Sequence, residues 1–138
     1  MGRIMAIDYG SKRVGIAVTD PGRIIASGLT TVHAKDVMEF LKSYFEKEAV
    51  EIIVVGEPKG LNNKKDEVSA AADRFSKELG RKFPDKIIER LDERFTSKIA
   101  SRTLIESGLK KKDRQNKALV DEISATLILQ DYLERIKK

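Results

Sequence analysis

The alternation of apolar and polar positions divides the chain into short segments of two kinds. Residues 3–7 and 52–55 are apolar runs of the length expected for buried strands, and residues 13–19 alternate loosely, with Gly15 inside. In residues 37–48, apolar side chains recur at steps of three and four, which predicts an amphipathic helix. The chain therefore mixes strands and helices.

Turn and stop signals separate these segments. Asp20-Pro21-Gly22 is a strong turn signal, and Gly80 and Gly108 are typical helix ends. The expected elements, in chain order, are strands at 3–7, 13–19 and 23–31, a helix at 37–48, a strand at 52–55, a helix at 68–79, a strand at 86–91, and helices at about 96–107 and 117–135.

This order of elements predicts an α/β fold. Three strands joined by short turns favour an antiparallel meander, and the later alternation of strands and helices favours parallel neighbours. We expect one domain, residues 1–138, built on a five-stranded mixed sheet flanked by helices. The sequence contains no internal repeat and no interdomain linker.

Composition narrows the class of protein. The chain has no cysteine, which excludes disulfides and thiolate metal sites. No apolar stretch approaches the roughly 18 residues of a membrane span, and the first residues do not resemble a signal peptide. We expect a cytoplasmic protein without a membrane partner.

Positive charge gathers in one part of the chain. The net charge is +5, and residues 98–120 alone hold seven Lys or Arg against two Asp or Glu. This clustering favours a polyanionic partner such as nucleic acid, although a solvated lysine-rich loop between helices would have the same composition.

Four carboxylates directly follow predicted strands, at the edge where α/β sheets form their sites. They are Asp8, Glu57, Asp92 and Glu93. A fifth, Asp121, shares a face of the last helix with the small and apolar side chains of Ala125, Ile128 and Tyr132. A carboxylate on such an inward face is costly unless something pairs with it.

Convergence of these groups would call for cations. Two carboxylates about 5 Å apart repel by roughly 3 kcal/mol at an effective dielectric constant of 20. Oxygen ligands of this kind suit Mg²⁺ or Mn²⁺, and two such ions about 3.5–4 Å apart are suited to phosphodiester cleavage. The basic stretch would then hold the nucleic-acid backbone.

Simpler roles stay open for each residue. Asp8 could cap its own turn, Glu93 could pair with Arg94, and Asp121 could pair with Lys117 one turn earlier. Glu57 precedes Pro58 and could be a loop charge, while Asp92 is more suited to a supporting role. Lys12 and Arg13 could contact phosphate or only solvent.

The sequence resembles the YqgF (RuvX) family of the ribonuclease H-like superfamily over nearly its whole length. The matching stretches are AIDYGSKRVGIAVTD, VVGEPKG, LDERFTS and KALVDEISATLILQDYL. The resemblance implies a ribonuclease H-like fold and a metal-dependent nuclease of the Holliday-junction-resolvase type. The family is also linked to maturation of the 5′ end of 16S rRNA, and so to ribosome biogenesis.

The resemblance also implies roles for individual residues. Carried over, the metal ligands are Asp8, Glu93 and Asp121, with Asp92 in the same acidic motif. The family usually has an apolar residue where this chain has Glu57, which could therefore be an extra ligand or a neutral change. Phosphate contacts are expected from the nearby cations Lys12, Arg13, Lys110, Lys111, Lys112, Arg114 and Lys117.

The preferred interpretation is therefore a two-metal endonuclease with precursor 16S rRNA as its substrate, or alternatively a resolvase of branched DNA. A sugar-kinase or actin-like ATPase shares the opening hairpin but needs a second domain, for which the chain has no room. A nucleic-acid-binding protein of the same fold without catalysis is a third hypothesis. The sequence leaves open RNA against DNA and a monomer against a homodimer.

Overall fold

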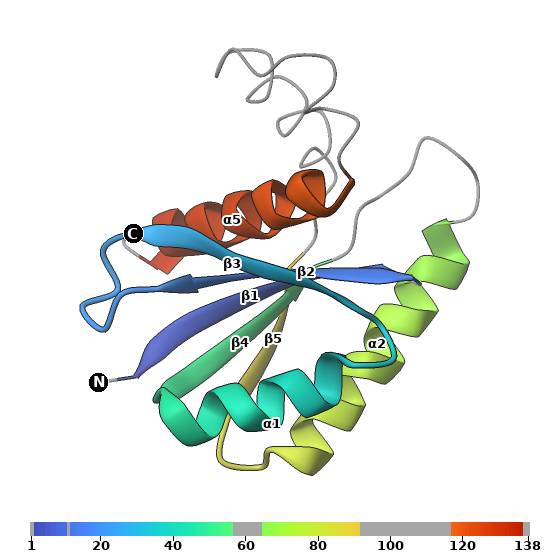
Figure 1. Cartoon of the computed structure of the whole chain (residues 1–138), viewed down its shortest axis with the longest axis horizontal. Helices are drawn as coiled ribbons and strands as arrows, with labels where there is room; N and C mark the ends of the chain where they lie inside the picture. Colours follow the sequence, from blue (N-terminus) through green and yellow to red (C-terminus); the bar gives the residue numbers. More distant parts are fainter. Residues whose placement is uncertain (1, 11, 57–64, 92–116, 137–138) are drawn as a thin grey trace.

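The structure is a computed structural model, and it describes residues 2–10, 12–56, 65–91 and 117–136. These residues form five strands and three helices (Figure 1). The elements are β1 (Arg3–Tyr9), β2 (Arg13–Thr19), β3 (Ala26–His33), α1 (Val37–Lys47), β4 (Val50–Gly56), α2 (Lys65–Lys82), β5 (Ile87–Leu91) and α5 (Lys117–Ile136). The helix expected at about 96–107 and the basic stretch 109–116 lie outside the described residues.

The strands form one mixed sheet in the order β3-β2-β1-β4-β5. The hairpins β1–β2 and β2–β3 are antiparallel, whereas β1–β4 and β4–β5 are parallel. The predicted meander followed by parallel strands is therefore confirmed.

The two faces of the sheet carry separate cores. Met5, Ile7 and Val55 face α1 and α2, and they pack with Leu41 and Phe75 from those helices. Ile4, Ala6 and Ala17 point to the opposite face and pack beneath α5, which contributes Ala125, Ile128 and Leu129. Among the described helices, Figure 1 shows α5 on one side of the sheet and α1 and α2 on the other side.

The turn after β2 is longer than the sequence suggested, so the prediction of a strand from residue 23 was wrong. The Asp20 carboxylate accepts hydrogen bonds from the amides of Ile24 and Ile25, both at 2.8 Å. Arg23 takes a left-handed conformation, with φ 59°. These residues close the turn, and β3 begins only at Ala26. The same two amides hold the pKa of Asp20 below its ordinary value.

Helix α2 is also longer than predicted, because Gly80 does not end it. The helix continues to Lys82, and the Phe83 amide still donates to the Leu79 carbonyl at 2.8 Å. Pro84 follows, and a proline both lacks an amide donor and restricts the residue before it. The end of α2 is therefore set by Pro84 rather than by Gly80.

Candidate active site

Asp8 is a buried carboxylate on the central strand of the sheet. It alternates with Ile4 and Ala6, so it points to the α5 face, and only 5% of its surface is exposed. Within the described residues its Oδ1 atom has no hydrogen-bond partner. Burial, and secondarily the charge of Asp121, raises the pKa of Asp8 from 3.8 to about 7. A buried carboxylate with an oxygen left over for a ligand is suited to binding a cation.

The strand register places the ends of three strands in one row. Asp8 pairs with Gly56 of β4, and Gly56 pairs with Leu91 of β5. The next residues in the sequence are Glu57 and Asp92, followed by Glu93. Those three carboxylates lie outside the described residues, so only the strand ends that precede them are located beside Asp8.

A glycine brings α5 close to this row. Gly15 pairs with Asp8 across the β1–β2 hairpin. A Cβ atom at Gly15 would lie 2.1 Å from the Asp121 carbonyl oxygen and 2.5 Å from its carbonyl carbon. No side chain fits in that space, because the atoms it would meet belong to the helix backbone. Glycine at this position therefore lets the start of α5 rest on β2, with Asp121 next to Asp8.

Asp121 is held by Arg13. The Arg13 Nε donates to Asp121 Oδ2 at 2.8 Å, and the Asp121 side chain is 21% exposed. This pair joins the first residue of β2 to the first turns of α5, 108 positions later. The inward face of α5 is confirmed, since Ala125 and Ile128 are fully buried.

Sequence reasoning missed this contact. It weighed Lys117 as the partner of Asp121 and gave Arg13 a role at phosphate or in solvent. A signal was present: Arg13 lies two positions before Gly15 in β2, so alternation directs both to the α5 face. Because Arg13 and Gly15 share a side of β2 and Asp121 lies on the inward face of α5, the sequence could have predicted the Arg13–Asp121 pair.

The described carboxylates fit part of a metal site. Asp8 and Asp121 provide adjacent oxygen donors of the kind that Mg²⁺ and Mn²⁺ prefer, and one buried oxygen of Asp8 has no partner among the residues that the structure describes. In the part of the chain that the structure describes, no three His, Cys, Asp or Glu residues are grouped closely enough to hold a metal. A complete site would need a further ligand from outside these residues.

The expected phosphate-binding residues are only partly described. Lys12 is exposed in the turn between β1 and β2, beside the row of strand ends. Lys117 begins α5, but its side chain lies outside the described part of the chain. Lys110, Lys111, Lys112 and Arg114 also lie outside it. Within the described residues, no helix is long and apolar enough to cross a bilayer.

Comparison with known proteins identifies relatives of this chain. Residues 2–135 match the family model RuvX, described as Holliday junction resolvase. A Flavobacterium psychrophilum protein named "Putative pre-16S rRNA nuclease" is 58% identical over 98% of each chain. A Bacteroides fragilis protein with the same name is 56% identical over 97% of each chain.

A solved structure confirms the fold class. The structure titled "T. thermophilus RuvC in complex with Holliday junction substrate" superposes on this chain with a TM-score of 0.56. The match covers 99% of this chain and 96% of that chain, at 13% sequence identity. The ribonuclease H-like fold expected from the sequence is therefore confirmed.

Proposed function

This chain belongs to the RuvX family of Holliday junction resolvases, and from that premise we propose that it is a metal-dependent nuclease of structured nucleic acid. The substrate we favour is precursor 16S rRNA, cleaved to mature its 5′ end in ribosome biogenesis. The names of close relatives support a nuclease of this substrate class.

The observation that carries the proposal is the buried oxygen of Asp8 beside Asp121, which has no hydrogen-bond partner in the described part of the chain. An ionised carboxylate so placed destabilises the fold unless a cation pairs with it or a proton neutralises it. At these carboxylates, bound Mg²⁺ or Mn²⁺ would make a water molecule more acidic and would neutralise charge on the phosphate. In the two-metal scheme, two such ions would act together. Asp8 and Asp121 would fix the position of the cation, and their own burial would exclude bulk water.

Glu93 is the third ligand that we propose. Leu91 packs with the core beneath α5, and Glu93 comes two residues later, the spacing that returns a side chain to the same face of an extended strand. Asp92 would then support Glu93. Glu57, one residue after the row containing Asp8, is a further candidate ligand.

Arg13 would link the acidic site to the substrate. Its Nε is bound to Asp121, and a guanidinium can present its outer nitrogens to a phosphate oxygen while one nitrogen holds a carboxylate. Lys12, Lys117 and the cations of residues 110–114 would bind neighbouring phosphates. These contacts would position the backbone without reading its sequence.

One observation favours a second candidate function, the resolution of branched DNA. The family model itself is described as a Holliday junction resolvase. The same carboxylates and cations would serve either substrate, since both reactions break a phosphodiester bond. A resolvase would need two sites, and therefore a dimer, whereas an RNA-processing enzyme would not.

The test uses two labelled substrates, a precursor of 16S rRNA and a four-way DNA junction. Each is incubated with the protein in Mg²⁺, Mn²⁺ or EDTA, alongside the variants Asp8→Asn and Asp121→Asn. We expect cleavage that requires metal and is lost in both variants, while nucleic-acid binding changes little. The substrate that is cut decides between RNA maturation and junction resolution.

The matched control is Asp131→Asn, which removes an exposed carboxylate from the same helix as Asp121. It should cleave like the wild type. Full activity of Asp8→Asn or Asp121→Asn would refute the ligand assignment. Binding of both substrates with no cleavage of either would favour a non-catalytic binding protein.

A further inference from the structure

We infer that the outer face of α2 is a second contact surface for the phosphodiester backbone, on the opposite side of the sheet from the proposed active site. Three cations form this face, Arg74, Lys77 and Arg81, and we call them the α2 stripe. They recur at steps of three and four, so they lie on one side of the helix. All three are exposed. This inference rests on the proposed function and extends its substrate-binding surface.

The charge of the α2 stripe is uncompensated. The acidic neighbours are paired with other cations: Asp73 with Arg90 at 3.0 Å, and Glu78 with Lys82 at 3.4 Å. Within the described residues, no ion pair involves a member of the stripe. Together with Glu78, the stripe lines a shallow depression on the surface. An anion that settles there would meet three positive groups and one carboxylate already balanced by Lys82.

Helix α1 is a useful contrast, because it has as many exposed cations but no excess of positive charge. Lys35, Lys42 and Lys47 are exposed on or beside it, and Asp36, Glu39 and Glu46 alternate with them. Positive and negative groups therefore cancel along α1. A polyanion would be attracted to α2 and not to α1.

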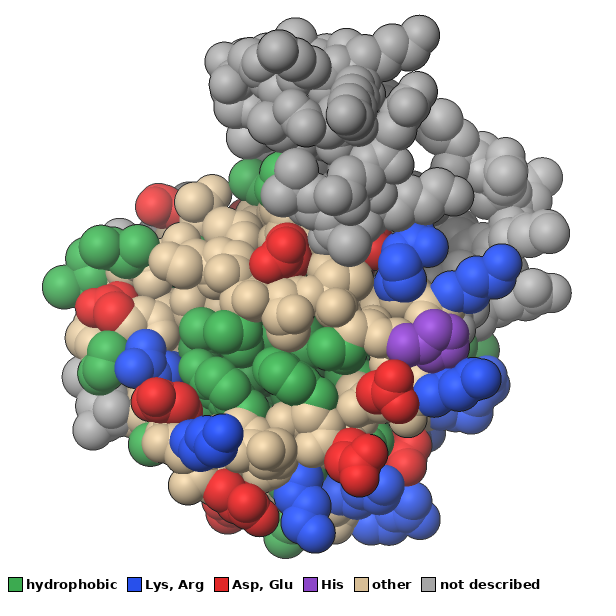
Figure 2. All heavy atoms as spheres, in the orientation of Figure 1, with side chains coloured by type: hydrophobic (Ala, Val, Ile, Leu, Met, Phe, Trp, Pro, Cys, Tyr) green, Lys and Arg blue, Asp and Glu red, His purple; other side chains and the backbone are tan. Residues whose placement is uncertain are grey.

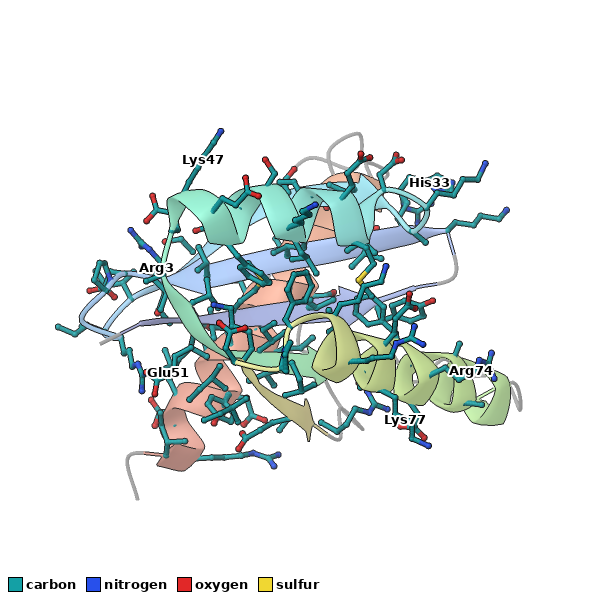
Figure 3. All side chains as sticks on the ribbon, turned by 90° about the horizontal axis from the view of Figure 1, so that it is seen from below. Arg3, His33, Lys47, Glu51, Arg74 and Lys77 are labelled. Carbon is teal, nitrogen blue, oxygen red and sulfur yellow. The ribbon has the colours of Figure 1, made fainter. Side chains whose placement is uncertain are left out.

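The α2 stripe begins near the end of β1 that carries Asp8, but on the opposite face of the sheet, where α2 packs. Phe75, next to Arg74 in the chain, stacks on Tyr9 with ring centroids 4.6 Å apart, and Tyr9 follows Asp8. From there the stripe leads away from the strand ends. Figure 3 shows Arg74 and Lys77 extending from the outer side of the helix, with Arg74 nearer the end of the sheet where His33 lies.

The length of the stripe suits a nucleic-acid strand. Seven residues of helix rise about 10 Å, and a strand of B-form duplex carries one charge per about 3.4 Å of axis. The three cations would thus span about three phosphate steps. Figure 2 shows Lys and Arg side chains on the side of the molecule that carries the histidine, interspersed there with Asp and Glu. A substrate held at Asp8 and Asp121 would reach α2 by passing around the strand ends to the other face of the sheet.

The test compares two triple variants of the full chain, Arg74→Gln/Lys77→Gln/Arg81→Gln on α2 and Lys35→Gln/Lys42→Gln/Lys47→Gln on α1. Both remove three positive charges from exposed positions. Binding to the precursor rRNA and to the four-way junction is measured from 50 to 300 mM KCl, together with cleavage at saturating substrate. Thermal unfolding verifies that both variants fold.

We expect the α2 variant to bind about tenfold or more weakly at low salt, with its salt slope reduced by about 2 to 3. Its cleavage rate at saturating substrate should be unchanged, so that KM rises and kcat does not. The α1 variant should keep a steeper salt slope than the α2 variant. Equal slopes in the two variants, with wild-type cleavage intact, would overturn the inference. A wild type that neither binds nor cleaves would instead refute the proposed function.

Discussion

The two faces of the sheet are packed with different types of side chain. Beneath α5 the sheet contributes three small residues, Gly15, Ala6 and Ala17, beside larger ones such as Ile4 and Val54, and a carboxylate is buried there. The opposite face combines aliphatic side chains with most of the described aromatic rings, with Tyr9 stacked on Phe75 and Phe45 edge-on to Phe83 at 4.9 Å between centroids, and we call it the ring-filled face. Small residues let a helix backbone approach the sheet, whereas rings keep helices further away and bury more apolar surface.

This difference separates two tasks. The α5 face brings Asp121 next to Asp8 and accepts an electrostatic cost in doing so. The ring-filled face has no buried charged side chain among the described residues, and its one buried hydroxyl near the rings, Ser76, donates to the Ala72 carbonyl at 2.9 Å. Stability should therefore come mainly from the ring-filled face, and chemistry from the α5 face.

The largest effect should come from removing the buried charge with Asp8→Asn. The pKa of Asp8 is about 7 in the folded protein against 3.8 as its ordinary value. Between these values the unfolded chain loses its proton and the folded chain keeps it, so the free energy of unfolding of the wild type falls as the pH rises. Each pKa unit corresponds to about 1.4 kcal/mol. Without metal, the variant should be more stable by about 4 kcal/mol at pH 8 and by little at pH 4.

Urea unfolding at several pH values in EDTA measures this difference. Asp131→Asn, which replaces an exposed carboxylate, should show no comparable dependence on pH. Added Mg²⁺ should stabilise the wild type and not Asp8→Asn. A stability difference that is constant from pH 4 to pH 8 would show that Asp8 is not a buried charge.

A slightly smaller effect is expected from Gly15→Ala. The added methyl group would lie 2.1 Å from the Asp121 carbonyl oxygen, so α5 must move away from β2. Overpacking against backbone should lower the free energy of unfolding by about 3 kcal/mol, at the upper end for such changes. Cleavage should also be lost, because Asp121 moves with the helix. Thermal unfolding and the cleavage assay measure the two effects, and wild-type behaviour in both would contradict the close approach.

Breaking the pair between Arg13 and Asp121 should have a moderate effect. Arg13→Gln leaves a partly buried carboxylate without its charged donor, and we expect a loss of about 1 kcal/mol in urea unfolding. The control is Arg135→Gln, which breaks the exposed pair with Asp131 at 3.1 Å and should change stability by less than about 0.5 kcal/mol. Equal effects of the two substitutions would mean that the Arg13 pair is no more than a surface contact.

The smallest effect should have the opposite sign. Gly80→Ala lies inside α2, and its methyl group would meet only Ile88 Cγ1 at 3.9 Å, an ordinary contact. Replacing glycine by alanine within a helix stabilises by roughly 0.5–1 kcal/mol. The melting temperature should rise slightly and cleavage should not change. A loss of stability would mean that the ring-filled face has no more space for an added methyl group at Gly80 than the α5 face has at Gly15.

Most of the fold could be predicted from the sequence because periodicity reports which side of an element is buried. Strand β2 was predicted with its observed bounds, and α5 to within one residue. The errors fall where local and longer-range interactions compete. Gly80 is compatible with a helix end, but Pro84 determines it, and the Asp20 carboxylate lengthens a turn that its residues already favoured.

The candidate site was predictable in part. The position of Asp8 at a strand end and the inward face of Asp121 follow from pattern alone, and their adjacency agrees with the sequence expectation. The partner of Asp121 was harder to predict, because a contact over 108 positions depends on how α5 crosses β2. That crossing depends on the absence of a side chain at Gly15. Neither the charge distribution nor the hydrophobic periodicity of the sequence predicts such a close approach.

The position of α5 in the chain has a consequence for protein synthesis. All five strands leave the ribosome before residues 117–136, so Asp8 is made long before Asp121. Until α5 docks, Ala6, Ala17 and Val54 lack their cover, and a nascent chain has only half of the described carboxylate pair. On the proposed function, translation order would itself delay activity: a nascent chain whose α5 has not yet emerged and docked could not cut RNA.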